Sequence, residues 1–205
     1  NDTDDYYKPA FVFNTSLIGA GEAISHEVGH NLGLNHDGLT AGNVGYYEGH
    51  GSGATGWAPI MGVGYYKMLV QWSKGDYSGA NNTEDDMAKI PSYGATLMVD
   101  DHSDTATGAS LLDTTTNGGT SALSGRGLIG LRADLDTFSF VSGAGSYSLT
   151  VSPAPYSPNL DLQVRIFNIY GMLVASSNPV DTLPATLSGS LAAGTYYLVV
   201  EGIGK

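Results

Sequence analysis

Three histidines near the start of the chain have the types and the spacing of metal ligands. They lie in the segment 26–37, which reads HEVGHNLGLNHD. If this segment begins as a helix, His26 and His30 lie one turn apart and project from the same face. Gly33 permits a positive φ, so the chain can leave the helix sharply and bring His36 back toward the other two imidazoles. Three neutral imidazoles, with no cysteine and no fourth protein ligand, predict an open zinc site.

Glu27 stands beside the first of these histidines, at the edge of the same helix face. A carboxylate in that position can take a proton from a water bound to the metal. The other side of the helix is apolar and should be buried; it carries Ile24, Val28 and Leu32, roughly 160–240° around the helix from His26. The alternative is that the three histidines are ordinary surface or core residues, which their spacing with the glutamate and the glycine disfavours.

The elements that must position this site are few and short. Residues 10–13 predict a strand, and a helix should begin within 18–21 and run to about Leu32. A second, short helix is expected over 83–90, with Pro91 past its end. These elements predict an α+β arrangement around the metal ligands.

The same segment matches the H-E-x-x-H-x-x-G-x-x-H signature of the metzincin zinc proteases. An aspartate after the third histidine makes it most similar to the adamalysin/reprolysin branch. The resemblance implies one catalytic zinc ion with three ligands, His26, His30 and His36. It also implies a general base, Glu27, and two structural residues at the site, Gly33 and Asp37.

Metzincins also carry a methionine turn beneath the metal, and the candidate here is WAPIMGVGYY at 57–66. Met61 would be an apolar floor to the site and not a ligand. In some metzincins a tyrosine two residues after the methionine reaches the metal. That position is Val63 here, so neither Tyr65 nor Tyr66 is given a metal role. The lack of cysteine makes the chain resemble a bacterial relative, because reprolysins are usually cross-linked by disulfides.

The charge balance narrows the range of partners. The 205 residues include 8 basic and 20 acidic side chains, which give a formal net charge of −12. This composition argues against nucleic acid or an anionic membrane as the primary partner. No apolar stretch approaches the roughly 18 residues that a membrane helix needs. The first five residues, NDTDD, are neither a signal peptide nor a start methionine.

The second half of the chain has a different pattern. Residues 100–125 are rich in Ser, Thr, Gly and Asp and predict a linker or the edge of a domain. Alternating apolar and polar residues then predict half-buried strands, at 136–141, 146–151, 160–166 and 195–200. Several strands at this spacing predict an antiparallel β-sandwich.

Three stretches of this half resemble the bacterial pre-peptidase C-terminal domain, a β-sandwich appended to secreted proteases; they are 134–140, 159–161 and 193–198. The expected organisation is therefore a metzincin-like domain at 1–95, with a zinc helix and a methionine-turn subdomain, followed by the β-sandwich at 99–205. Because a metzincin normally has a sheet before its zinc helix and the sandwich normally has one more strand, the chain looks cut at both ends.

Other residues offer weaker candidates. Calcium is a second candidate cofactor, because carboxylate oxygens suit that hard ion. The aspartates concerned are Asp100, Asp101, Asp104, Asp134 and Asp136. They lack an EF-hand-type spacing, so solvated turns are the alternative. His50 and His102 are lone histidines without ligand spacing, and Trp72 is either a groove residue or ordinary packing.

The sequence as a whole predicts a secreted, bacterial zinc-dependent metalloendopeptidase that acts on a protein or peptide substrate. A rival hypothesis is a catalytically incompetent chain that acts as a binding or adhesion module through its β-sandwich. A third hypothesis is a purely structural zinc, which is disfavoured because structural sites usually close with a fourth protein ligand.

Overall fold

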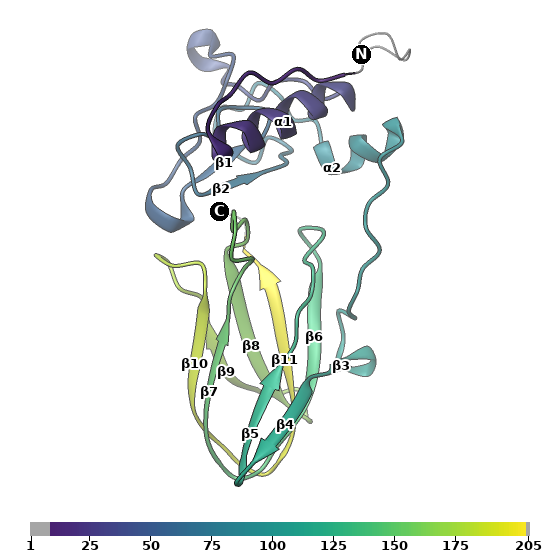
Figure 1. Ribbon diagram of the computed structural model, residues 1–205, viewed down its shortest axis with the longest axis vertical. Helices are drawn as coiled ribbons and strands as arrows, with labels where there is room; N and C mark the ends of the chain where they lie inside the picture. The colour runs from purple at the N-terminus through teal and green to yellow at the C-terminus, as the bar shows by residue number, and fades with distance from the viewer. Residues whose placement is uncertain (1–8, 204–205) are drawn as a thin grey trace. The chain divides into compact units, whose positions relative to one another are not determined.

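The computed structural model describes residues 9–203, so the acidic start of the chain and its last two residues lie outside the described part. The fold is mixed α+β, with many strands and few helices (Figure 1). The chain divides into two compact units. The first unit comprises residues 1–97 and 154–159, and the second unit comprises residues 98–153 and 160–205.

The first unit is built around helix α1 (Leu17–Asn31). The helix begins after Ser16, whose side chain accepts a hydrogen bond from the backbone N–H of Gly19 at 3.0 Å, as an N-cap should. Short elements follow: η1 (Ala41–Asn43), η2 (Gly53–Thr55), β1 (Trp57–Pro59), β2 (Leu69–Gln71), α2 (Asp86–Lys89) and η3 (Ile90–Tyr93). Strands β1 and β2 pair in parallel, and Asn159 bonds through its side chain to the backbone of Val70 in β2.

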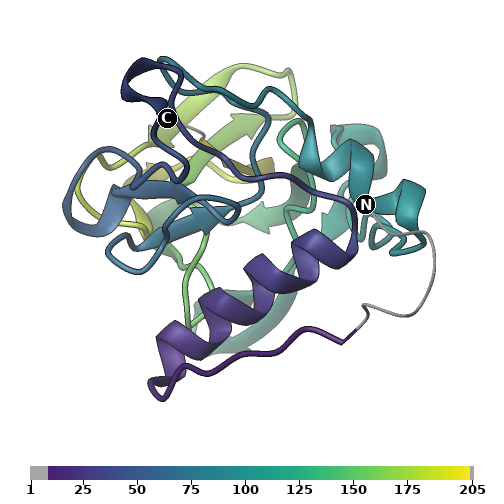
Figure 2. The same ribbon diagram turned by 90° about the horizontal axis from the view of Figure 1, so that it is seen from above.

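The strand predicted at 10–13 does not form. In the described part of the chain this segment pairs with no other strand, and it runs back beside α1 as an extended chain (Figure 2). Phe11 and Phe13 are exposed. A strand needs a neighbouring edge to satisfy its backbone groups, and the apolar composition of four residues cannot supply one.

The apolar side of α1, which helix periodicity alone would bury, is largely exposed. Ile24 and Val28 are 51% and 39% exposed, and Leu32 is only half-buried. The residues that α1 does bury are two glycines, Gly19 and Gly29. The helix therefore packs through its smallest residues, where the backbone can approach its neighbours closely.

The second helix is shorter than predicted. Helix α2 begins only after Asp85, whose side chain accepts a hydrogen bond from the N–H of Ala88 at 3.2 Å. This cap excludes residues 83–85 from the helix. Pro91 lies past the end of α2, as predicted, and stands in the first turn of η3, where its missing N–H costs nothing.

The second unit holds the longer strands. They are β3 (Ser110–Leu111), β6 (Leu135–Ser142), β7 (Gly145–Val151), β8 (Leu162–Asn168), β9 (Leu173–Ser177), β10 (Ala185–Leu191) and β11 (Gly194–Gly202). One sheet has the order β3-β6-β11-β8-β9 and another pairs β7 with β10; all pairs are antiparallel except β3 with β6. Inward-facing side chains of both sheets, such as Val164 and Leu187, share one core. Two sheets around one core form a β-sandwich, as the alternating pattern predicted.

The segment 100–125 is more ordered than a linker. It contains η4 (Ala106–Gly108), strand β3 and a hairpin of β4 (Asp113–Asn117) with β5 (Thr120–Ser124). The hairpin turns at Gly118 and Gly119, which both have positive φ, as a two-residue type I′ turn requires. Composition missed this hairpin because its residues are almost all polar and exposed.

Candidate metal centre

The structure brings His26, His30 and His36 together. Their potential ligand nitrogens all lie within 4.8 Å of one another, and all three side chains are half-buried. Nε2 of His30 lies 2.9 Å from Nε2 of His36. Two nitrogens bound to the same tetrahedral zinc are about 3.3 Å apart for Zn–N bonds of about 2.0–2.1 Å. The three rings thus stand close to the separation that a shared metal would require.

Hydrogen bonds to the backbone orient two of the rings. Nδ1 of His26 donates to the carbonyl oxygen of Ile60 at 2.8 Å, and Nδ1 of His30 donates to that of Leu34 at 3.0 Å. A carbonyl oxygen can only accept, so the hydrogen of each neutral ring sits on Nδ1 and its Nε2 carries a lone pair. Such partners are typical of metal-binding histidines.

The surroundings favour the neutral form of the triad. Burial lowers the pKa of His26 and of His36; the imidazole of His30 lowers both pKa values further, and that of His26 also lowers the pKa of His36. Metal binding needs deprotonated imidazole, so a lowered pKa prepares these rings for a cation at neutral pH.

The turn after α1 explains how His36 returns to the helix face. Gly33 has a φ of +79°, and a Cβ at this position would lie only 2.4 Å from the ring of Tyr93. A side chain is therefore excluded both by backbone conformation and by packing. Beyond the turn, the N–H of Asn35 donates to Glu84 and the N–H of Gly38 donates to Asn81, which braces the loop on both sides of His36.

Met61 packs beneath the helix that carries the first two histidines. It is fully buried in a small core with Leu34 and Ile90. A Cβ on Gly29 would lie 2.5 Å from its sulfur atom, so the glycine between the first two histidines is what lets Met61 approach α1. The carbonyl oxygen of the neighbouring Ile60 accepts the hydrogen bond from His26. The segment that contains Ile60 and Met61 therefore packs beneath α1 and also orients one ring of the triad.

Asp37 is a buried structural link rather than part of the triad. Its N–H donates to the carbonyl of Met61 at 2.9 Å, and its carbonyl accepts from the N–H of Tyr47 at 2.7 Å. Burial, reinforced by the charge of Glu84, raises the pKa of its carboxyl to about 6. The residue therefore ties the histidine loop to the methionine segment.

Glu27 is half-buried on α1. Its negative charge raises the pKa of both His26 and His36, which places its carboxylate within electrostatic reach of the triad. The triad and this glutamate together combine a cation-binding set of nitrogens with a nearby base.

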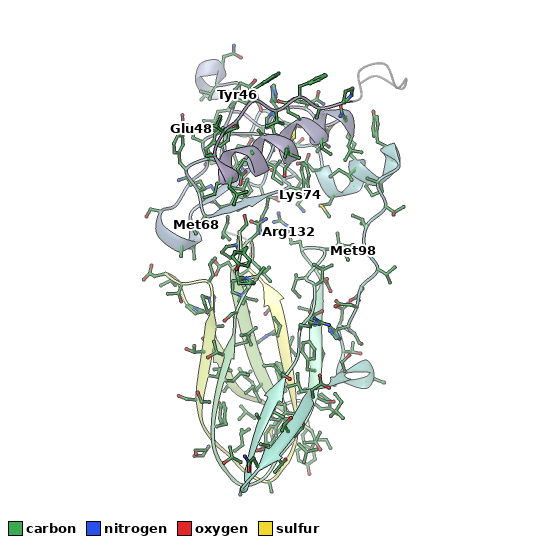
Figure 3. All side chains as sticks on the ribbon, in the orientation of Figure 1. Tyr46, Glu48, Met68, Lys74, Met98 and Arg132 are labelled. Carbon is green, nitrogen blue, oxygen red and sulfur yellow. The ribbon has the colours of Figure 1, made fainter. Side chains whose placement is uncertain are left out.

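A tyrosine that the sequence did not single out lies against the triad. The ring centroid of Tyr46 is 4.3 Å from that of His36 and 6.2 Å from that of His26. Tyr46 stands on the loop between η1 and η2 (Figure 3). Tyr65 and Tyr66, the tyrosines after the methionine, are exposed. No local pattern marks Tyr46, because its position depends on a loop that returns to the helix from a distance.

The other candidate residues are not members of the histidine triad. His50 bonds to the hydroxyl of Tyr47 and packs on Trp57, and Trp72 packs against the Met61 core. His102 and the five aspartates lie in the second unit. They form two groups of potential metal ligands: Asp101, His102 and Asp136; and Asp100, Asp104 and Asp134.

Comparisons with models of protein families, with curated proteins and with solved structures find no match to this chain. Within residues 9–203, no helix is both long enough and apolar enough to span a membrane.

Proposed function

We propose that this protein is a zinc-dependent metalloendopeptidase whose first unit holds the metal. The observation that carries the proposal is the convergence of His26, His30 and His36, with Nδ1 of two rings anchored to backbone carbonyls. With Nδ1 engaged, Nε2 of His26 and of His30 keeps a lone pair for a metal, as an open three-histidine zinc site requires. The metzincin-like fold of this unit belongs to the same proposal and rests on the sequence signature.

In this proposal, different residues of the chain have different roles in hydrolysis. Bound zinc would supply a polarised carbonyl and a water of lowered pKa. Glu27 would accept a proton from the attacking water and return it to the leaving amine. Met61 and Asp37 would keep the ligand loop in register with α1, because both are buried and bonded across the two segments.

A protein or peptide chain is the proposed substrate, and secretion from a bacterium is part of the same proposal. Both rest on the resemblance to metzincins and to the pre-peptidase C-terminal domain. The rival hypothesis, a non-catalytic binding module, predicts a protein that cleaves no peptide at any zinc concentration.

The test is peptide cleavage by the full-length natural protein, after removal of metal and reloading with zinc. The parent should cleave an unstructured protein, and Glu27→Gln should keep its zinc but lose activity by about 10²–10⁴-fold. Glu201→Gln is the matched control, because Glu201 pairs with Arg165 on a strand of the second unit. Equal activity in the Glu27→Gln variant and the parent would exclude the general base, and no cleavage by the parent would favour the binding module.

A further inference from the structure

Five aspartates of the second unit converge where the segment 100–104 meets the start of β6. Three of them come from that segment, and Asp134 and Asp136 come from the turn into β6 and from the strand itself. The two segments are paired by backbone: the N–H of Thr137 donates to the carbonyl of Ser103 at 3.0 Å. Strands β3 and β6, which flank this meeting point, lie side by side (Figure 1).

Backbone N–H groups hold four of these aspartates by one carboxylate oxygen each. The N–H of His102 donates to Asp100 at 3.1 Å and that of Leu128 donates to Asp101 at 3.1 Å. The N–H of Leu135 donates to Asp104 at 2.9 Å and that of Gly130 donates to Asp134 at 2.6 Å. Within the described residues the second oxygen of each accepts no hydrogen bond, and that of Asp101 lies 3.7 Å from Nε2 of His102. Each side chain is therefore fixed in place with one oxygen left to bind something else.

Asp136 supplies the observation that points to a ligand. It is 2% exposed, and its Oδ1 is buried without any hydrogen-bond partner. It shares a group of potential ligand atoms, all within 4.8 Å of one another, with Asp101. Oδ1 of Asp134 is likewise buried without a partner. A buried carboxylate oxygen without a donor is costly, and a cation removes that cost.

The donor chemistry selects the cation. The remaining group in the cluster, His102, has both ring nitrogens engaged, Nε2 with the carbonyl of Arg126 at 2.8 Å and Nδ1 with Ser110 Oγ at 2.7 Å. Only oxygens are then available, which suits a hard cation rather than zinc. Calcium accepts six to eight oxygens in a flexible arrangement, whereas magnesium demands a regular octahedron and retains several waters.

Gly127 closes the cluster from one side. A Cβ at this position would lie 1.9 Å from Oδ2 of Asp136 and 2.8 Å from the ring of His102. The backbone at Gly127 therefore lies against the carboxylate of Asp136, at a distance that a side chain on residue 127 would not allow.

We propose that these aspartates bind calcium as two neighbouring groups, Asp101 with Asp136, and Asp100 and Asp104 with Asp134. Calcium bound there fastens the segment 100–104 to the first residues of β6 and so completes the fold of the second unit. The inference does not depend on the proposed peptidase activity, because binding and melting report on it directly.

The test is a calcium titration of the zinc-saturated full-length protein, followed by calorimetry and by thermal melting. The parent should bind calcium. At millimolar concentration, calcium should raise the melting temperature of the second unit by at least about 5 °C. Asp136→Asn keeps the shape of the side chain and should weaken calcium binding by at least about tenfold. Asp181→Asn is the control, because Asp181 is exposed and outside the cluster.

Asp104→Asn provides a second variant at an exposed position, in case Asp136→Asn does not fold. It too should weaken calcium binding while Asp181→Asn leaves binding unchanged. The proposal is overturned if the parent takes up no calcium, or if Asp136→Asn and Asp104→Asn bind it as the parent does. An equal response to magnesium would overturn the assignment to calcium.

Discussion

The histidine triad of the first unit and the aspartate cluster of the second unit are organised in opposite ways. The triad presents imidazole nitrogens from one helix and the sharp turn that follows it, within a single short segment. The cluster presents carboxylate oxygens from two segments more than twenty residues apart, each fixed by a backbone N–H. Nitrogen donors favour zinc and oxygen donors favour calcium, which is why we propose a different metal for each unit.

Exposure separates the two sites further. The three histidines are all half-buried, whereas the aspartates range from exposed, at Asp100, Asp101 and Asp104, to Asp136, which is only 2% exposed. An open three-histidine site leaves a position for a water or substrate, whereas the calcium proposed in the second unit would join two segments of its chain. We therefore propose that the first unit carries the chemistry and that the aspartates of the second unit contribute stability.

The largest expected effect comes from removing one metal at a time. A chelator that prefers zinc should abolish peptide cleavage, because Glu27 would have no activated water to act on. A calcium-selective chelator should lower the melting temperature of the second unit and leave most of the cleavage activity. Cleavage assays and thermal melting on the same samples check both. Loss of cleavage with the calcium-selective chelator alone would break the division of roles between the two units.

Substitutions in the two hydrophobic cores should show whether the two units unfold separately. Met61→Ala should destabilise the first unit by about 2–5 kcal/mol, because Met61 is fully buried beneath α1. Met61→Leu keeps the volume and should cost less than about 1.5 kcal/mol. Val164→Ala is the counterpart in the core of the second unit. Calorimetry should show two transitions, each lowered by its own substitution; one common transition lowered by both would contradict two separate units.

A smaller effect is expected from a buried carboxyl of the first unit. Burial, with added repulsion from Asp37 and Glu84, raises the pKa of Asp86 to about 7 from an ordinary 3.8. The folded state then holds the proton more tightly than the unfolded state, so its contribution to stability is lost as the pH rises from about 4 to about 7. Asp86→Asn cannot ionise and can still accept the hydrogen bond from the N–H of Ser73.

The Asp86→Asn variant should therefore exceed the parent in stability by about 1–3 kcal/mol at pH 8, with a difference that shrinks toward pH 4. Urea unfolding across this pH range measures the difference. Asp113→Asn, at an exposed position in the second unit, should change nothing. A variant whose stability falls with pH as steeply as that of the parent would rule out Asp86 as the titrating group.

The sequence predicted the parts of this molecule that depend on local pattern. Helix periodicity and one glycine were enough to bring His26, His30 and His36 together, because all three stand in one short segment. Alternation was enough for the buried side of β8, where Leu162, Val164 and Ile166 face inward.

Features that depend on residues far away in the sequence could not be predicted from local pattern. The strand at 10–13 failed because nothing in the described part of the chain pairs with it, and the apolar side of α1 was left exposed at Ile24 and Val28. The place of Tyr46 beside His36 follows from the path of a loop. The aspartates were candidates from their type alone; only the fold shows that Asp136 is buried without a partner.

The most direct test of the account is the zinc content of the full-length protein, measured after removal of metal and equilibration with limiting free zinc. The parent should bind one zinc ion per chain at the triad. His36→Ala removes the ligand that the turn at Gly33 brings back and should lose that zinc, while the exposed-site control Asp181→Asn keeps it. Full zinc occupancy in His36→Ala, or no zinc in the parent, would contradict the three-histidine centre.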